Sequence, residues 1–170
     1  MNEKEGKAAA ERLGANASYF NMDVSCSESV QQAINATWEQ FQALHIVNNF
    51  AGIGPACKTF SKKGPHSLDM YVKVVMINQV GTFNMCRLAA EKMALNEPVN
   101  SDGLRGVLIN TASVAAYEGQ IGQVAYSATK GAVVSMTLPM ARELAPYGIR
   151  VVTIAPGLIH TPLFDTIEES

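Results

Sequence analysis

The chain has 170 residues, of which 48% are hydrophobic and 16% charged, so its composition excludes a disordered chain and fits one globular domain. The net charge of -2, without any basic block, argues against nucleic acid as a direct partner, and no apolar run is long enough to span a membrane. Cys26, Cys57 and Cys86 are widely spaced, which supports neither a disulfide framework nor a metal site and favours a reducing compartment.

The N-terminal quarter of the chain alternates helix and strand patterns. Residues 3–13 predict a helix that ends at Gly14, and residues 18–24 (SYFNMDV) predict a short strand. Residues 27–41 predict a second helix, because Val30, Ile34, Trp38 and Phe41 recur at helical spacing. Ser25, with Glu28 three residues later, fits a capping box at the start of that helix.

The middle of the chain predicts a strand, a loop and a long helix. Residues 44–52 (LHIVNNFAG) predict the strand, and residues 53–66 form a loop rich in glycine, proline and lysine. Residues 67–94 predict one long helix with a possible bend near Gly81. A polar loop follows at residues 96–106.

The remaining elements complete an alternating pattern. Residues 106–113 (GVLINTAS) predict a buried strand, residues 126–145 a helix, and residues 149–156 (IRVVTIAP) another strand. This alternation predicts parallel β-strands joined by helical crossovers, with helices on both faces of the sheet. Ligands of such sheets bind beyond the carboxyl ends of the strands, where residues 49–52, 111–113 and 156–161 would meet.

The pair Tyr126 and Lys130 is a candidate catalytic element. A spacing of four residues places both side chains on one helix face. A nearby ammonium favours the phenolate, and lowering a tyrosine pKa by about 3 units takes roughly 4 kcal/mol. Such a tyrosine could exchange a proton with an alcohol or ketone oxygen. A packed tyrosine beside a solvated lysine gives the same spacing, so the pair alone decides nothing.

Two further polar residues could complete such a site. Ser113 ends a buried strand thirteen residues before Tyr126, and its hydroxyl could donate to the same substrate oxygen. Judged alone, Ser113 is more typical of an ordinary serine that ends a strand in a turn. Asn78 stands in the middle of a predicted helix, where asparagine is a mediocre helix former. It could bind a freed carbonyl or a water leading to Lys130, or simply face solvent.

The stretch NTASVAAYEGQIGQVAYSATKGAVVSMTLPMARELAPYGIRVVTIAPG resembles the short-chain dehydrogenase/reductase family. The Ser–Tyr–Lys spacing, the N-[NC]-A-G element and the Pro-Gly turn recur in order over nearly the whole chain. The resemblance implies a doubly wound parallel α/β sheet (Rossmann-like) in a single domain, residues 1–170, and NAD as cofactor. It implies NAD-dependent oxidation of a secondary alcohol, a 3-hydroxyacyl-CoA or a hydroxysteroid, to the ketone by hydride transfer.

The resemblance also assigns roles to individual residues. Tyr126 would be the acid/base, Lys130 would bind the nicotinamide ribose, Ser113 would polarise the substrate oxygen, and Asn78 would hold a relay water. The residues expected to contact the cofactor also include Asp23, Val24, Asn49, Ala51, Gly52, Pro156, Gly157 and Thr161. Gln120 and Gln123 would face the substrate, together with Ser113.

The chain departs from the family pattern in four respects. Phe50 replaces the second residue of N-[NC]-A-G, where a bulky ring could crowd the sheet. Pro139 stands inside the helix expected at 126–145, where we expect a tolerated kink. The glycine-rich TGxxxGxG turn, which holds the pyrophosphate, does not occur. The resemblance therefore implies that the family's first two strands and last strand are lacking.

Partners and location follow from the same resemblance. It implies a homotetramer built through the helices at 67–95 and 126–145, and a mitochondrial location, with the cytoplasm as the alternative. An alternative function is an inactive, truncated isoform that serves as an interaction subunit, for example in a mitochondrial tRNA-processing complex.

Overall fold

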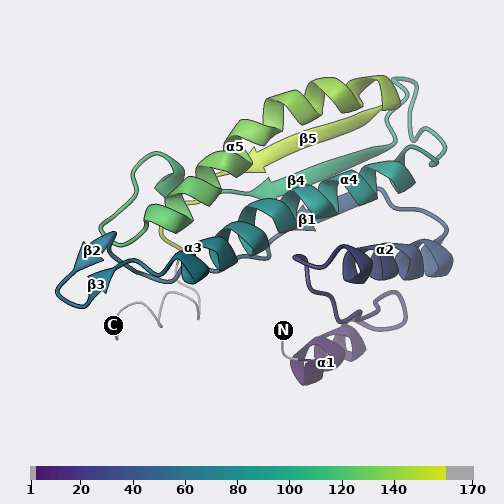
Figure 1. Ribbon diagram of the computed structural model, residues 1–170. Helices are drawn as coiled ribbons and strands as arrows, with labels where there is room; N and C mark the ends of the chain where they lie inside the picture. Colours follow the sequence, from purple (N-terminus) through teal and green to yellow (C-terminus); the bar gives the residue numbers. More distant parts are fainter. Residues whose placement is uncertain (1–2, 160–170) are drawn as a thin grey trace.

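The computed structural model describes residues 3–159 (Figure 1). Thr161, one of the expected cofactor contacts, lies outside these residues. The main elements, in chain order, are α1 (Glu3–Leu13), α2 (Ser27–Phe41), β1 (Ile46–Asn49), α3 (Leu68–Val74), η1 (Val75–Val80), α4 (Gly81–Met93), β4 (Gly106–Thr111), α5 (Val124–Leu144) and β5 (Ile149–Ile154). The minor ones are strands β2 (Phe60–Ser61) and β3 (Gly64–Pro65) and the 3-10 turns η2 (Val114–Ala116) and η3 (Ala145–Tyr147).

The main sheet has the order β1-β4-β5, and both of its strand pairs are parallel. In register, Val47 pairs with Leu108, which pairs with Val151. The helical segment from α3 to α4 connects β1 to β4, and α5 connects β4 to β5. The structure therefore confirms the predicted α/β class, a Rossmann-like parallel sheet with helical crossovers.

The hydrophobic core lies between one face of this sheet and helices α2, α4 and α5. Its most buried large side chains include Val30, Met93, Leu108 and Ile149. Side chains alternate along β1 and β5, so that Val47 and Val151 enter the core while their neighbours are exposed. Ile46, Val152 and Ile154 are 59%, 43% and 53% exposed, on the opposite face. Helices on both faces were expected, but in the described part of the chain they pack on one face only, because both crossovers step in the same direction.

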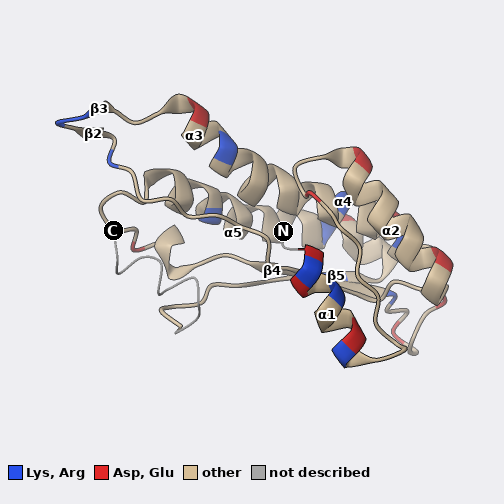
Figure 2. Cartoon of the chain, turned by 90° about the horizontal axis from the view of Figure 1, so that it is seen from below, with Lys and Arg blue, Asp and Glu red and all other residues tan. Residues whose placement is uncertain are grey.

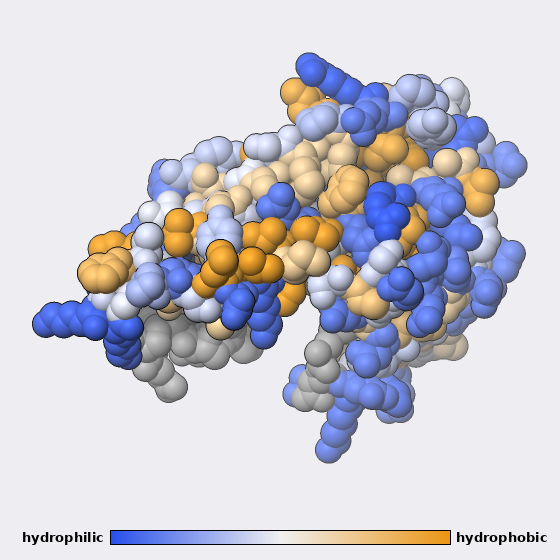
Figure 3. Space-filling view, viewed as in Figure 1, coloured by the Kyte–Doolittle hydropathy of each residue, from blue (hydrophilic) through white to orange (hydrophobic). Residues whose placement is uncertain are grey.

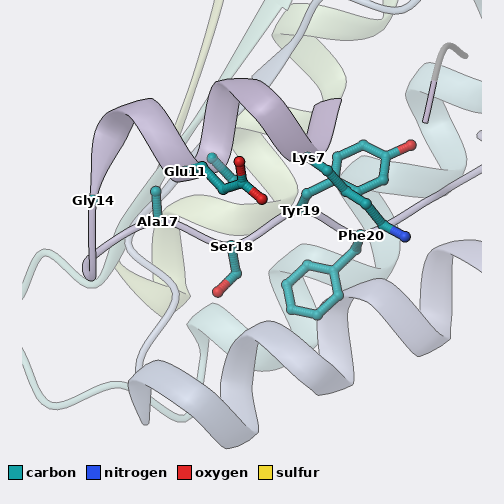
Figure 4. A pocket seen from close by; sticks show the side chains of 8 residues that line it. Lys7, Glu11, Gly14, Ala17, Ser18, Tyr19 and Phe20 are labelled. Atoms are coloured by element: carbon teal, nitrogen blue, oxygen red, sulfur yellow. The ribbon is translucent and has the colours of Figure 1, made fainter. Parts of the chain in front are cut away.

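The strand expected at residues 18–24 is not formed. Residues 18–23 have no regular secondary structure, Val24 stands in a turn, and the segment pairs with no strand among the described residues. Tyr19 packs against Gly6 of α1, and Figure 4 shows Phe20 turned the other way, toward α2. This alternation suits a strand, but a strand needs a neighbour to satisfy its backbone groups, and β1 pairs only with β4.

The long helix expected at residues 67–94 is continuous in space but changes its winding. α3 begins after Ser67, whose hydroxyl caps the Met70 amide, and residues Val75–Val80 form a π-helical segment before α4. Gly81 itself has ordinary helical dihedral angles, φ -61° and ψ -44°. A Cβ there would lie 2.6 Å from Val24 Cγ2, so Gly81 permits close packing rather than a bend.

Two local expectations at element ends need correction. Ser25 does not cap α2: its hydroxyl and amide donate to Asp23, and Cys26 precedes the helix without a side-chain cap. Phe50 does not crowd the sheet, because its ring is 74% exposed. The expectation for Pro139 agrees with the structure, because helix α5 runs through this exposed proline without ending there.

The loop expected at residues 53–66 contains a small hairpin. Strands β2 and β3 pair antiparallel, with Ser61 opposite Gly64. Figure 2 shows basic residues at the hairpin tip, where the sequence places Lys62 and Lys63. Strands of two residues are too short to give an alternating pattern, which is why the sequence did not reveal them.

Candidate active site

Tyr126 and Lys130 lie together on the first turns of α5. The Lys130 Nζ atom is 5.5 Å from the centre of the Tyr126 ring, which places the cation within the range of a cation–π contact. Tyr126 is half-buried, and its hydroxyl has no hydrogen-bond partner among residues 3–159. The phenol is thus held through its ring while its oxygen is left for a ligand.

Lys130 is a buried amine that is tied to the end of the central strand. Its side chain is 5% exposed, and Nζ donates a hydrogen bond of 2.6 Å to the carbonyl oxygen of Thr111, the last residue of β4. Burial lowers the pKa of Lys130 below its ordinary value, because water no longer solvates the charge. A buried cation without a facing carboxylate is costly, and such groups concentrate at functional sites.

Asn78 fastens the loop after β1 to the helices. It is 1% exposed, and its side-chain amide makes two hydrogen bonds of 2.8 Å to the backbone of Ile53, accepting from the amide and donating to the carbonyl. The alternative of a solvent-facing asparagine is therefore wrong. Its own backbone carbonyl oxygen accepts from Thr82 Oγ1 at 2.7 Å, within the π-helical segment η1. Such segments are frequent at functional sites.

Thr129 completes this connection, and the sequence reasoning missed it. It is fully buried, its hydroxyl accepts from Asn78 Nδ2 at 3.1 Å and donates to the Tyr126 carbonyl at 2.8 Å. Asn78 is thereby linked to the first turn of α5. The available signal was a threonine next to Lys130 in the sequence, and this signal does not distinguish Thr129 from an ordinary helical threonine.

Ser113 lies two residues beyond β4, at the same end of the sheet. Its Oγ accepts from the Ala115 amide at 3.1 Å, which leaves the hydroxyl hydrogen available to a ligand. The next residue, Val114, donates to the Pro156 carbonyl at 2.9 Å, so the turn after β5 lies beside Ser113. Gly157 follows, in open space.

Gly52 and Gly54 bring the loop after β1 over these side chains. A Cβ at Gly52 would lie 3.3 Å from Asn78 Oδ1 and 3.6 Å from Lys130 Nζ. A Cβ at Gly54 would lie 3.1 Å from the Tyr126 ring. The close approach explains why small residues occupy this loop, and it places the exposed Gly52 beside the buried amine.

The other residues expected to contact the cofactor have different surroundings. Ala51 is exposed next to Gly52, whereas the Asn49 side chain is buried and donates to Asn110 Oδ1 at 2.8 Å in the core. Asp23 is exposed, and hydrogen bonds from Ser25 lower the pKa of its carboxyl. Val24 packs against the start of α4. The Asn49 side chain is therefore engaged within the core, whereas Ala51 and Asp23 are exposed.

Gln120 and Gln123 line a pocket of about 470 Å³ beside α5. Lys58 and Phe60 form the facing wall, and the Ile121 side chain is 83% exposed nearby. The side-chain carbonyl oxygen of Gln123 accepts from the Gln120 amide at 2.9 Å, which fixes the turn. The two glutamines thus share a pocket that adjoins the first turn of α5.

A second pocket, of about 390 Å³, lies between α1 and residues 17–20 (Figure 4). Lys7 and Glu11 edge it on one side, with Tyr19 and Phe20 on the other. It contains no cluster that would suit proton transfer. In residues 3–159 no group of histidine, cysteine and acidic side chains could hold a metal ion. No helix in the same range is long and apolar enough to cross a bilayer.

Comparisons with known proteins agree with this geometry. The family model described as short chain dehydrogenase matches residues 1–170. The chain is 51% identical over 166 residues to human 3-hydroxyacyl-CoA dehydrogenase type-2, covering 96% of this chain and 63% of the relative. It is 33% identical to a 3-alpha-(or 20-beta)-hydroxysteroid dehydrogenase from Mycobacterium bovis, covering 98% and 60% respectively.

The fold has a close match among solved structures. The crystal structure of 3-hydroxyacyl-CoA dehydrogenase type-2 from Mycobacterium avium superposes with a TM-score of 0.90 at 39% identity, covering 97% of this chain and 65% of that one. The chain thus spans about two thirds of the length of these relatives. Because the family model matches it throughout, and the Ser113, Tyr126 and Lys130 pattern lies at the carboxyl end of a parallel sheet, the chain belongs to the short-chain dehydrogenase family.

Proposed function

We propose that the protein oxidises a secondary alcohol to a ketone with NAD, and that the alcohol belongs to a 3-hydroxyacyl-CoA or a hydroxysteroid. The observation that carries the proposal is the buried Lys130 amine held beside the Tyr126 ring at the end of β4. A purely structural lysine would reach solvent, whereas this one loses its hydration to stay next to the phenol.

The proposed roles follow from the donors and acceptors at the site. The Ser113 hydroxyl donates to the substrate oxygen, and Tyr126 takes the proton of the substrate hydroxyl. Lys130 supports the charge that develops on the phenol oxygen, because a cation nearby favours the phenolate. Asn78 holds the loop after β1 in place through Ile53, so that the Tyr126 ring stays covered on one side.

The residues at this edge suit a nicotinamide nucleotide. The amine of Lys130 can donate to ribose hydroxyls, and the exposed backbone at Ala51 and Gly52 leaves room for a flat ring system to approach the sheet. When bound, the nicotinamide accepts the hydrogen and two electrons that leave the substrate carbon. The choice of NAD over NADP follows from the sequence resemblance to the short-chain dehydrogenase/reductase family.

The substrate class rests on the names of those relatives. Five curated relatives that are 48–51% identical are each named 3-hydroxyacyl-CoA dehydrogenase type-2, and a more distant one is a hydroxysteroid dehydrogenase. The mitochondrial location is inferred from the same resemblance. The pocket beside Gln120 and Gln123 is the nearest space for the alcohol, since it adjoins the turn that carries Tyr126.

A chimera tests the proposal. Residues 1–170 replace the matched stretch of the human relative in one continuous chain, and NAD reduction is followed with 3-hydroxybutyryl-CoA. We expect Tyr126→Phe to lower kcat by about 10²- to 10⁴-fold while NADH binding is retained. Tyr117→Phe, at a tyrosine that is 70% exposed, is the matched control and should keep full activity. Turnover that survives Tyr126→Phe would refute the proposed role.

We also propose that copies of the chain associate through the helices at 67–95 and 126–145. Exposed apolar side chains follow the outer surface of α3, η1 and α4, where Figure 3 shows them gathered; they are Leu68, Val72, Met76, Val80 and Phe83. Large exposed apolar patches mark interaction sites. The mass of the chain in solution, measured by light scattering, should exceed 18.2 kDa and fall toward it in Phe83→Asp. A monomeric chain excludes the assembly.

A further inference from the structure

Thr129 stands one residue before Lys130 in α5, and its side chain is completely buried. Its hydroxyl has two partners: it donates to the carbonyl oxygen of Tyr126 at 2.8 Å and accepts from Asn78 Nδ2 at 3.1 Å. The first bond stays within one turn of the helix. The second joins α5 to η1, part of the long helical segment that lies beside α5 (Figure 1). A single hydroxyl therefore connects two elements at the turn that carries Tyr126.

The direction of every bond in this connection is fixed by the backbone amide of Ile53. That N–H group can only donate, so the Asn78 atom 2.8 Å from it is the side-chain oxygen. The Asn78 side-chain nitrogen then has two hydrogens, one for the Ile53 carbonyl at 2.8 Å and one for Thr129. Because Thr129 accepts that hydrogen, its own proton is left for the Tyr126 carbonyl. The donors thus run one way, from the loop after β1 to the first turn of α5.

The second N–H group of the Asn78 side chain depends on Thr129. Asn78 is 1% exposed, so solvent does not offer another acceptor. A buried donor that loses its acceptor costs its full desolvation free energy, which exceeds the net contribution of the bond. Without the Thr129 hydroxyl, the Asn78 amide would turn toward another acceptor, and both of its bonds to Ile53 would weaken. Thr129 therefore holds the Asn78 amide in the orientation that binds the loop.

The connection also returns to Tyr126 through its ring. Gly54 follows Ile53 in the loop, and a Cβ at Gly54 would lie 3.1 Å from the Tyr126 ring, so the loop backbone packs against that ring. Tyr126 is thus held at its carbonyl by Thr129 and at its ring by the loop that Asn78 binds. These contacts form a closed circuit, which fixes the ring relative to its own backbone. The position of the phenol oxygen follows from it.

We propose that Thr129 is a positioning residue for proton transfer at Tyr126. Because Thr129 is completely buried, it acts through Asn78 and the loop and not through contact with a ligand. Its hydroxyl fixes where the phenol oxygen meets the substrate hydroxyl, and a displacement of about 1 Å at a reacting group can cost about 10²-fold in rate. The inference rests on the proposed function for the reaction at Tyr126, whereas the circuit of contacts can be tested without that reaction.

Hydrogen exchange tests the circuit in the 170-residue chain, without cofactor or substrate. Thr129→Val keeps the shape of the side chain but removes the hydroxyl. It should accelerate exchange of the Ile53 amide at least about fivefold, because that amide donates to Asn78. Thr129→Ser restores the hydroxyl without the methyl group, and it should keep the exchange rate within about twofold of that in the original chain.

Thr137→Val is the matched control for this measurement. Thr137 is another partly buried threonine of α5, and its hydroxyl likewise joins a helix carbonyl, that of Val133, to another element, at Thr153 of β5. The change removes a comparable pair of bonds further along the helix and should leave Ile53 exchange unaltered. Thr129→Ala, which also lacks the hydroxyl, replaces Thr129→Val if circular dichroism shows that the valine variant does not fold.

The kinetics of the chimera with the human relative test the role in catalysis. Thr129→Val should lower kcat about 10- to 100-fold while the KM for the alcohol changes by less than about threefold. A displaced phenol slows proton transfer, whereas the groups that contact the substrate stay in place. Thr129→Ser and Thr137→Val should both keep kcat and KM within about threefold of the original values.

Three results overturn the proposal. The first is an unchanged Ile53 exchange rate or an unchanged kcat in Thr129→Val. The second is equal acceleration of exchange by Thr129→Val and Thr137→Val, which indicates a general loss of stability. The third is a loss of kcat in Thr129→Ser as large as in Thr129→Val, because the hydroxyl would then not carry the effect. A chimera without turnover refutes the proposed function and the catalytic role with it, whereas the exchange rates still decide whether Thr129 holds the loop.

Discussion

The Nζ atom of Lys130 lies 2.6 Å from the carbonyl oxygen of Thr111, so a cation of helix α5 is tied to the end of the central strand β4. The bond crosses from one element to the next and holds the amine below the loop at Gly52. The spacing of four residues places Lys130 and Tyr126 on one face of the helix, and the hydrogen bond to Thr111 fixes the Lys130 amine beside the Tyr126 ring.

Lys130 should give the folding stability a specific pH dependence. Its folded pKa is lowered from 10.5 by burial, so between the lowered value and 10.5 the unfolded chain binds more protons. Its contribution to stability therefore rises with pH in that window. In urea unfolding, Lys130→Met and Lys130→Arg should both lack this rise, because neither side chain titrates there. A variant that keeps the original pH dependence would contradict the assignment.

Asn78→Ala should loosen the loop after β1. The change removes two hydrogen bonds to the Ile53 backbone and one to Thr129, and each typically contributes about 1 kcal/mol net, so we expect a loss of about 2–4 kcal/mol. Hydrogen exchange at Ile53 should accelerate. Asn35→Ala, at an asparagine of α2 whose side chain accepts from Gln31, is the control and should cost less than about 1 kcal/mol. If Asn78→Ala and Asn35→Ala lower the free energy of unfolding equally, Asn78 does not hold the loop at Ile53 as proposed.

Two helical glycines should respond oppositely to alanine. Gly131 lies inside α5, where an added Cβ would have nothing within 4 Å, so Gly131→Ala should stabilise the chain by about 0.5–1 kcal/mol. Gly81→Ala places a Cβ 2.6 Å from Val24 Cγ2 and should destabilise it by about 1–3 kcal/mol. Thermal unfolding of both variants decides the matter, and a stabilising Gly81→Ala would show that Val24 can move aside.

The Cys86 thiol should lower the free energy of unfolding as the pH becomes alkaline. Burial raises the pKa of this thiol from 9.0 to about 11, so between these values the unfolded thiol ionises while the folded one keeps its proton. The folded state then binds more protons, and stability falls by up to about 2–3 kcal/mol across the interval. Cys86→Ala should show a shallower decline in urea unfolding under reducing conditions. If stability declines with pH as steeply in Cys86→Ala as in the original chain, a group other than Cys86 causes the decline.

Most of the fold could be predicted from hydrophobic periodicity. The expected helix at 3–13 agrees with α1, and the strands expected at 106–113 and 149–156 contain β4 and β5. The strand expected at 18–24 failed for a physical reason, since strand-like residues form a strand only when a neighbour accepts their backbone hydrogen bonds. The Ser25 capping box failed because the Asp23 carboxylate competes for the same hydroxyl and amide.

The candidate site was predictable in part. The spacing of Tyr126 and Lys130 fixes a shared helix face, and the position of Ser113 after a buried strand places it at the ligand-binding edge. The partner of Asn78 could not be predicted, because Ile53 lies 25 residues away and the bond depends on how the π-helical segment turns the side chain. Thr129 was missed for the same reason, since its value depends on Asn78 being opposite.

The sequence by itself determined the alternation of helices and strands and the residues that share a helix face, because these depend on interactions between near neighbours. Only the tertiary structure decided that Lys130 is buried against Thr111, that Asn78 holds Ile53, and that within residues 3–159 the helices cover one face of the sheet. Those features depend on contacts between segments that are distant in the sequence. The burial of a polar side chain and its hydrogen-bond partner are fixed only when the helices pack on the sheet.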